Sequence, residues 1–415
     1  MPIDINQDSP TYRAWPIFLI AFMRLLYVSI FERALANYLL WVVNIDLSTL
    51  GFITSAGAIA YIFAPILGQF ITSKIGIRNA LIFSSIITPL LTGLQIIYTE
   101  AWFLIICRVS LGLSMGLFWP NCMNLLSRWQ KLSTREKAKK NFRNFNFSWN
   151  LGFVIGLILG FVWTLLLNDY ISLIISWCLS FLLIPVSFFI NKDSVIQIPK
   201  EEIQIHLENP IIGEDFKMIA KKNSKPTMMS FPIVFSWIGI IFLATSKSIM
   251  LFTYPVFAKL NSLESYSTYL VQGGIQLAQL TGLTLINVMN VYKRKISMLS
   301  SFAVLTVMTF TIFYIGSIWY IAIIFAISGL FFGLIHGTSM KIMLDYGAKK
   351  NTGRYSTINE IVIGIGFGVT PIIAGFVAII NIYLIFVYII ASGITFLIIL
   401  IYISRNIKRS KFVTP

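Results

Sequence analysis

The first hydrophobic stretch of the sequence, Trp15-PIFLIAFMRLLYVSIFERALANYLL-Trp41, is long enough to decide the class of the protein. Its two tryptophans stand about 26 residues apart, which as an α-helix corresponds to roughly 40 Å. That length matches the hydrocarbon core of a bilayer together with its headgroup regions, where tryptophan is enriched. The run is too long for a signal-peptide core and no small-residue cleavage site follows it, so we expect it to remain as the first transmembrane helix.

Comparable apolar runs recur along all 415 residues, of which 57% are apolar and only 12% charged. A soluble domain needs far more charge to cover its surface, and the runs do not alternate at period two as the strands of a membrane barrel do. We therefore predict an all-α polytopic membrane protein with twelve transmembrane helices, at residues 14–41, 50–72, 79–98, 102–127, 145–167, 171–190, 230–255, 267–290, 297–315, 319–344, 357–379 and 382–403.

The twelve spans fall into two similar sets of six, because short matches recur at an offset of about 216 residues. The matched stretches are Trp15-Pro16-Ile17 with Phe231-Pro232-Ile233, Gly112–Leu117 with Gly329–Leu334, and Gly160–Val162 with Gly375–Val377. This parallel repeat predicts two pseudo-symmetric six-helix bundles, at residues 1–190 and 230–404. The polar stretch 191–229 between them is too short to bury its own core and is expected to be a cytoplasmic linker. Residues 405–415 are expected to form a cytoplasmic tail.

Basic residues show on which side of the membrane the loops lie. In the twelve-helix layout, 27 of the 32 lysines and arginines fall on the side of the two termini, whereas Lys259 alone falls on the other. The excess of basic residues in cytoplasmic loops of membrane proteins therefore places both termini in the cytoplasm. The formal net charge of +16 follows from this topology, so we expect no nucleic-acid partner.

Three short motifs resemble the signatures of a known transporter family. The loop after the second span reads Gln69-FITSKIGI-Arg78, the fourth span contains Leu104-IICRVSL-Gly112, and the fifth contains Gly152-FVIGLIL-Gly160. Together with the six-plus-six repeat, these stretches resemble the major facilitator superfamily of secondary transporters. Two departures are that Ser73 stands where the loop signature has an acid, and Leu157 where the antiporter motif has a proline.

The resemblance implies transport by two bundles that rock about a central cavity, with a cytoplasmic gate in the loop between the second and third spans. The predicted gate residues are Ser73, Lys74, Gly76 and Arg78. Glycines at spacings of four form flat stripes where helices can approach closely. The predicted helix-packing glycines are Gly112, Gly116, Gly152, Gly156 and Gly160.

Five ionisable side chains lie within spans: Arg24, Glu32, Arg33, Arg108 and Lys247. Each costs roughly 2.5 kcal/mol or more near the bilayer centre unless it faces protein or water. The repeat offset puts Lys247 at nearly the depth of Glu32, so we expect these two to face each other across a central site, with Arg24 at its cytoplasmic end. Glu32 is the proton-coupling candidate; the alternative is a permanent ion pair with an arginine. Arg33 and Arg108 either line the cavity or extend toward the headgroups.

Polar residues complete the predicted cavity. Gln272, Gln276 and Gln279 share one face of the eighth span and are expected to face inward, either toward solute or in hydrogen bonds between helices. Glu360 lies a few residues into the eleventh span, where we expect loop bases to be its partners. The predicted substrate or translocation residues are Arg24, Glu32, Arg108, Lys247, Gln272 and Gln276.

Four basic candidates against one acid favour a polar or anionic organic solute, carried with protons or another gradient because the sequence has no phosphate-binding loop for ATP. A drug or metabolite exporter of the same superfamily is the alternative, and a non-transporting membrane sensor a third hypothesis. Since no catalytic constellation and no metal-ligand spacing is found, we expect neither an enzyme nor a cofactor. The expected partners are a small solute and the lipid bilayer, for a monomer in the cell membrane.

Overall fold

The computed structural model describes residues 13–131, 135–191, 232–350 and 354–405, whose regular structure is helical with no strand. The first bundle contains α1 (Trp15–Tyr38), the π-helix η1 (Leu39–Val43), α2 (Leu47–Ile75), α3 (Ile77–Ile97), α4 (Ala101–Lys131), α5 (Arg135–Leu166), α6 (Asp169–Ser180) and α7 (Leu183–Phe188). The second contains α10 (Ile233–Leu260), α11 (Ser267–Val288), α12 (Val291–Thr311), α13 (Ile318–Lys350), α14 (Arg354–Ile380) and α15 (Leu384–Arg405). The expected linker and tail lie almost wholly outside the described residues.

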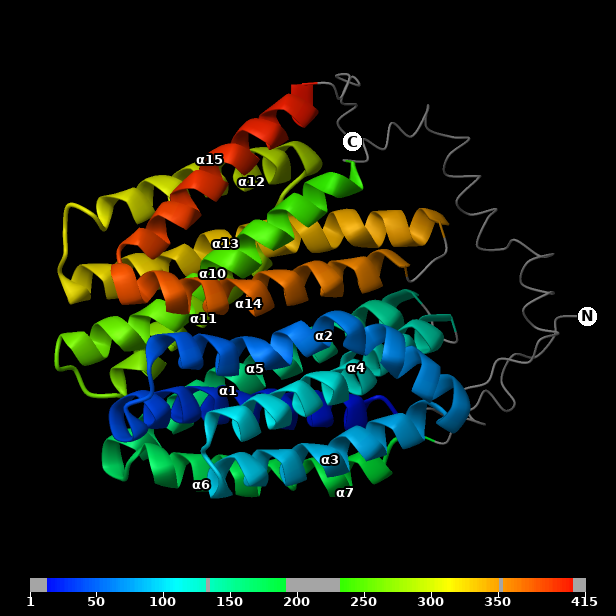
Figure 1. Cartoon of the computed structure of the whole chain (residues 1–415). Helices are drawn as coiled ribbons and strands as arrows, with labels where there is room; N and C mark the ends of the chain where they lie inside the picture. The colour runs from blue at the N-terminus through cyan, green and yellow to red at the C-terminus, as the bar shows by residue number, and fades with distance from the viewer. Residues whose placement is uncertain (1–12, 132–134, 192–231, 351–353, 406–415) are drawn as a thin grey trace, which may run out of the picture.

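The helices form two bundles, α1–α7 and α10–α15, which lie against each other with their long axes roughly aligned (Figure 1). The bundles meet mainly where α2 packs on α14 and α5 on α11. The predicted fold class, an all-α polytopic protein with two six-helix bundles, is confirmed. Within the described residues, ten helical stretches are long and apolar enough to cross a membrane. The other two are α11, which carries three glutamines, and α12, which begins with a basic cluster.

The sixth predicted span, 171–190, is not one continuous α-helix. It is divided into α6 and α7 by a tight turn in which Phe181 N–H donates to Cys178 O (3.2 Å) and Leu182 N–H to Leu179 O (3.1 Å). Such i→i−3 bonds are typical of a short 3₁₀ segment. Pro185 then lies in the first turn of α7, where its missing N–H leaves no hydrogen bond unmade.

Local sequence determines where the helices begin and end. Asp46 caps α2: its carboxylate accepts hydrogen bonds from Thr49 N–H (2.8 Å) and the Ser48 hydroxyl (2.5 Å). These bonds, first of all the one from Ser48, lower the pKa of Asp46 to about 2. At the other end of α2, Gly76 adopts a φ of 84° and so allows a one-residue turn into α3.

Close glycine contacts hold equivalent helix pairs together in the two bundles. A Cβ atom at Gly116 would overlap the backbone of Ala64 between α4 and α2, and one at Gly333 would overlap the Gln279 carbonyl between α13 and α11. The glycines that revealed the sequence repeat thus make the same kind of contact in both bundles. Since lipid tails are as apolar as leucine, such close backbone packing is what holds helices together in a membrane.

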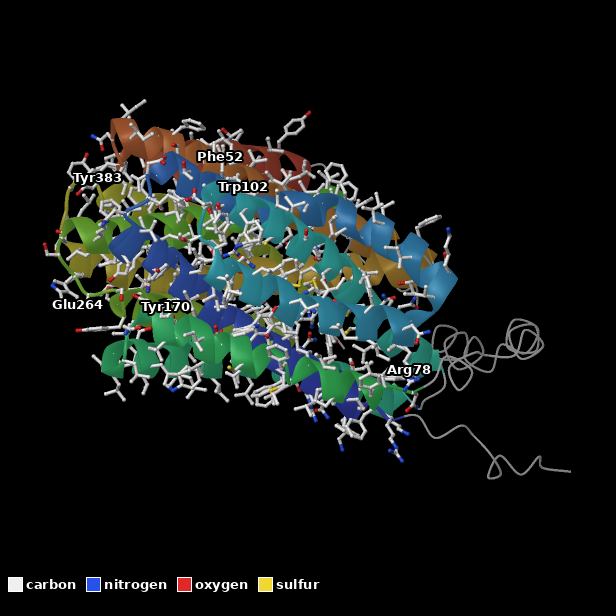
Figure 2. All side chains as sticks on the ribbon, turned by 60° about the horizontal axis from the view of Figure 1, so that its bottom comes forward. Phe52, Arg78, Trp102, Tyr170, Glu264 and Tyr383 are labelled. Carbon is white, nitrogen blue, oxygen red and sulfur yellow. The ribbon has the colours of Figure 1, made fainter. Side chains whose placement is uncertain are left out.

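The two ends of the bundle differ in charge and are named accordingly. The end where α1 begins and α2 ends carries Arg78 and the basic start of α12, and is called the basic end. The end where α1 ends carries Glu264 and is called the opposite end. Arg78 and Glu264 indeed lie at opposite extremes of the molecule (Figure 2).

Candidate functional site

Arg24 lies inside the first bundle, completely buried among α1, α3 and α4. Its Nη1 donates to the Ser84 hydroxyl and its Nε to Met115 Sδ, both at 3.2 Å. The guanidinium carbon lies 4.3 Å from the centroid of the Phe118 ring, a cation–π geometry. Nη2 has no hydrogen-bond partner among the described residues. Arg24 is therefore a buried cation held by neutral groups only.

Glu32 forms an ion pair with Arg108, which joins α1 to α4. The prediction that Glu32 faces Lys247 is wrong for this conformation, because the carboxylate of Glu32 is taken by Arg108. The hypothesis that Arg108 extends toward the headgroups is also wrong, since its side chain is only 7% exposed, whereas that of Glu32 is 43% exposed. Of the two partners, the carboxylate is the more accessible.

Arg33 connects the two bundles. Its Nε donates to Gln272 Oε1 on α11 (2.7 Å), and its Nη1 donates to the Leu251 carbonyl on α10 (3.1 Å). The side chain is buried rather than directed to the headgroups. Gln272, predicted to line the cavity, is thus engaged by an arginine from the other bundle.

Lys247, near the middle of α10, is held by two glutamines. Its Nζ donates to Gln276 Oε1 (3.1 Å) and to Gln279 Oε1 (2.6 Å), and Gln276 Nε2 in turn donates to Asn150 Oδ1 on α5 (3.3 Å). The Lys247–Gln276–Asn150 chain therefore crosses from one bundle to the other. His336 on α13 lies within electrostatic range of Lys247, and its Nδ1 has no partner in the described structure.

The bundles are joined more densely toward the opposite end. The buried amide nitrogen of Asn37 on α1 lies 3.2 Å from Asp169 Oδ1, 3.0 Å from the Ser265 carbonyl and 3.0 Å from Thr268 Oγ1. The sequence analysis missed this cluster, although an asparagine inside the first apolar run was a visible signal for it.

The π-helix η1 adds further bonds at the opposite end, because a π-turn frees backbone groups from the regular helical ladder. The Lys259 ammonium donates to the Leu40 carbonyl and to Asn44 Oδ1, and Trp41 Nε1 donates to the Leu263 carbonyl (3.3 Å). Trp41, expected in the headgroup belt, is thus a contact between bundles. Together with the Asn37 cluster and Arg33, these bonds join the bundles along the opposite-end half of α1.

A seam joins α2 and α14. Tyr61 donates to Glu360 Oε2 at 3.0 Å. The side chains of the nearest loop bases, which were expected to pair with Glu360, lie outside the described residues; the described partner is a tyrosine of the other bundle. The periodicity of the apolar runs contained no signal for this pairing.

The predicted gate residues make their described contacts within the first bundle. Arg78 donates to the carbonyls of Ile190 (2.9 Å) and Phe188 (3.1 Å), at the end of α7. A cation at a helix C-terminus complements the helix dipole. Ser73 bonds back to the Phe70 carbonyl, and the Lys74 ammonium lies over the Phe70 ring. A clamp between the bundles at this loop stays a prediction.

The predicted glycine stripe of α5 lies against α1 and α11. A Cβ atom at Gly152 would overlap the Phe22 carbonyl, one at Gly156 would overlap Ser29 Oγ, and one at Gly160 would overlap the Tyr269 ring of α11. Gly112 packs in the same way on Gly57 of α2. These glycines lie at helix contacts within and between the bundles.

The charges of this region are unbalanced. Arg24 and Arg33 are buried and Lys247 is partly buried, and they form no ion pair within the described residues, where Arg108–Glu32 is the one salt bridge. Neutral oxygens, a sulfur atom and an aromatic face hold them instead. Arg33 and Lys247, which both contact glutamines of α11, suit a carboxylate or phosphate group, whereas Arg24 points into the first bundle. No cluster of metal-binding side chains occurs in the described part of the chain.

Comparison with known proteins identifies the family. The family model described as Major Facilitator Superfamily matches residues 17–286 and 236–415. No curated protein matches the sequence. Among solved structures, the nucleoside transporter NupG matches with a TM-score of 0.65 at 15% identity, over 95% of this chain and 99% of that one.

A POT family transporter in complex with 5-aminolevulinic acid matches with a TM-score of 0.71 at 13% identity, over 95% of this chain and 96% of that one. A POT family transporter in complex with a thioalcohol-conjugated peptide matches with a TM-score of 0.70, likewise at 13% identity, over 95% of this chain and 96% of that one. At such identities these structures are similar in fold, whereas the family model covers nearly the whole sequence. This chain belongs to the Major Facilitator Superfamily and is a multi-pass membrane transporter.

Proposed function

We propose that the protein carries a small polar or anionic organic solute across the cell membrane by alternating access. The observation that carries this proposal is that the buried Arg24 and Arg33 and the partly buried Lys247 have no carboxylate partner among the described residues. Buried charges are normally paired because desolvation is costly. A negatively charged solute would supply the missing counter-charge.

The distribution of contacts between the bundles supports alternating access. Bonds from Arg33, Asn37 and Lys259 join the bundles toward the opposite end. The basic end faces the cytoplasm in this proposal, in accordance with the excess of lysine and arginine there. The conformation is then closed toward the outside, and transport requires these bonds to break as the bundles rock.

The solved structures of similar fold suggest which solutes to test. They are a nucleoside transporter and transporters bound to a peptide and to 5-aminolevulinic acid. The last carries a carboxylate and an amine. For this chain the surplus of buried cations favours the carboxylate-bearing compounds over the nucleosides.

Glu32 is the group we propose to couple transport to protons. It is paired with Arg108 yet 43% exposed, and in this proposal the exposed carboxylate faces the aqueous cavity, from which a proton reaches it. Protonation of Glu32 would release Arg108, which could then bind a solute anion in addition to the cations named above. This exchange of partners gives a physical link between proton binding and solute binding.

Purified protein in proteoliposomes tests the function. Uptake of 5-aminolevulinic acid, a dipeptide, a nucleoside and a simple dicarboxylate is compared with and without an inward proton gradient. We expect accumulation of a carboxylate compound that requires the gradient in wild type and loses that requirement in Glu32→Gln. Transport restricted to the uncharged nucleoside would contradict the anion proposal, and an unchanged gradient dependence in Glu32→Gln would contradict the coupling role.

The same vesicles decide between an importer and the exporter alternative. An importer accumulates solute when the outside is acidic, whereas a proton-driven exporter does so in vesicles whose interior is acidic. A protease added outside the vesicles cuts only the protein molecules whose cleavable face points outward. The cut fraction gives the orientation of the protein, and therefore the face on which each gradient acts.

A further inference from the structure

Glu360 is an acid at the seam between the two bundles whose described partner is a neutral side chain. Its Oε2 accepts the hydrogen bond from Tyr61 (3.0 Å), and no lysine or arginine nitrogen of the described residues lies within 4.0 Å of its carboxylate. The neighbouring Asn359 is 1% exposed, and neither polar atom of its side chain has a described partner. Glu360 is itself partly buried, and an acid packed between two helices with only a neutral hydrogen-bond donor is costly to ionise.

Among the described residues, the helices packed against α14 place no lysine or arginine nitrogen within 4.0 Å of the Glu360 carboxylate; Lys341 of α13 makes another interaction. These helices are α2, α10, α13 and α15. Lys247 of α10 is engaged by two glutamines, and His336 of α13 lies close to Lys247. Tyr388 of α15 lines a small cavity with Thr370, nearly three helical turns along α14 from Glu360. Tyr61 is the titratable group that contacts Glu360 in the described structure.

The position of Glu360 along the seam ties its solvation to the arrangement of the bundles. The α2–α14 contact runs from Leu47 against Gly375 at the opposite end, through Ile59 against Gly368, to Tyr61 against Glu360 toward the basic end. Glycines allow the two backbones to approach closely along this line. If the bundles part at the basic end, the Tyr61–Glu360 contact is the part of the seam that water reaches first.

We propose that Glu360 is a proton-binding site of the transport cycle, neutral while α2 and α14 are in contact and ionised when they part. The carboxyl O–H bond breaks on opening, and the proton passes to water at the basic end. By linkage, protonation must then favour the closed seam. The proposal rests on the alternating-access function given above and assigns a second proton site besides Glu32.

A distance measurement without any solute tests this site. Spin labels are placed at Asn79→Cys and Lys293→Cys, exposed positions at the basic ends of the two bundles, after the native cysteines are replaced. The distance between the two spin labels is recorded at about pH 5 and at about pH 8, so that a partly buried carboxyl group can change its protonation state between the two conditions. We expect shorter distances at the lower pH in wild type, and short distances at both pH values in Glu360→Gln.

Glu264→Gln serves as the control, because it removes an exposed carboxylate at the opposite end and should keep the pH response. Glu32→Gln shows whether the response belongs to the other proposed proton site instead. Equal distances at both pH values in wild type, or a persisting response in Glu360→Gln, would overturn the proposal. So would a response lost in Glu32→Gln alone.

If Glu360→Gln does not fold, Tyr61→Phe takes its place. Without the hydroxyl the closed seam loses its hydrogen bond to the Glu360 carboxyl group, so the seam should close at a lower pH than in wild type, and an unchanged closing pH would contradict the proposal. Because no solute is present, failure to find a transported compound leaves these outcomes interpretable.

Discussion

Lys247 is the single side chain whose charge should matter most for solute binding. Lys247→Met keeps the length of the side chain and removes its charge. Because a hydrogen bond to a charged group contributes about 1.5–3 kcal/mol, the affinity for a carboxylate solute should fall about 10- to 100-fold. Binding isotherms of purified protein measure this loss. Lys293→Met, at the exposed start of α12, is the matched control and should bind as wild type.

Glu32 and Arg108 should act as one unit in stability measurements. Glu32→Gln leaves Arg108, 7% exposed, without a counter-charge, which should lower stability by about 1–3 kcal/mol. In Glu32→Gln/Arg108→Gln the loss should be smaller than the sum of the single losses, with a coupling of about 0.5–3 kcal/mol. Thermal unfolding in detergent provides the comparison. Strictly additive losses would show that the pair contributes nothing.

The sequence was sufficient to find the buried charges but not to pair them. Arg24 and Arg33 are nine residues apart, about 180° around a helix, so they had to face opposite directions. In the structure one enters the first bundle at Ser84 and the other reaches Gln272 of the second. Which direction faces which bundle depends on the rotation of α1 against its neighbours, and a single-helix pattern does not contain that information. For this reason Glu32 was matched with Lys247 by depth alone.

At the scale of the helix, the Asp46 cap should make the stability of α2 depend on pH. The folded pKa of about 2 lies below the value of an unfolded chain, about 3.9. The cap therefore stabilises the fold above the unfolded value, and its contribution is lost as pH falls through the folded one.

Asp46→Ala should cost about 1 kcal/mol near neutral pH, while Asp46→Asn, which keeps a capping oxygen, should cost less. The difference between Asp46→Ala and wild type should shrink as the pH falls toward the folded pKa. Thermal unfolding across that range measures it. A difference independent of pH would contradict a role for the ionised carboxylate.

The glycine contacts between α11 and α13 should not tolerate a larger side chain. Gly333→Val places a side chain against the Gln279 carbonyl and should destabilise the second bundle by about 1–3 kcal/mol. Gly273→Ala on the same α11 is the matched control, because a Cβ there meets nothing within 4 Å. Melting temperatures of the two variants make the test. Equal effects would mean that close packing at Gly333 is unimportant.

Apolar runs predicted the number and order of the elements well and their ends less well. The fourth span was expected at 102–127, whereas α4 extends over Ala101–Lys131, and the tenth at 319–344, whereas α13 extends over Ile318–Lys350. Hydropathy marks where a helix leaves the membrane, and backbone hydrogen bonding continues beyond that point. The break between α6 and α7 interrupts no apolar run, so hydropathy could not show it.

For the whole molecule, alternating access predicts that a covalent link at the opposite end stops transport. Lys259 and Asn44, whose side chains are 2.7 Å apart between the bundles, are replaced by cysteines in a cysteine-free background and joined by a reducible cross-linker. Uptake into proteoliposomes should cease and should return after reduction. Each single-cysteine variant should be indifferent to the reagent. Full uptake in the linked protein would exclude opening at that end.

The surplus of buried cations has a consequence for ion leakage. A transporter that opens to water on alternate sides risks passing sodium or potassium along its path. Arg24, Arg33 and Lys247 give the middle of this protein a positive fixed charge that no described carboxylate cancels. A fixed positive charge at low dielectric repels inorganic cations, as it does in selective pores. The same side chains that are proposed to bind a solute anion would therefore prevent sodium and potassium from leaking through the empty protein, and so preserve the membrane voltage.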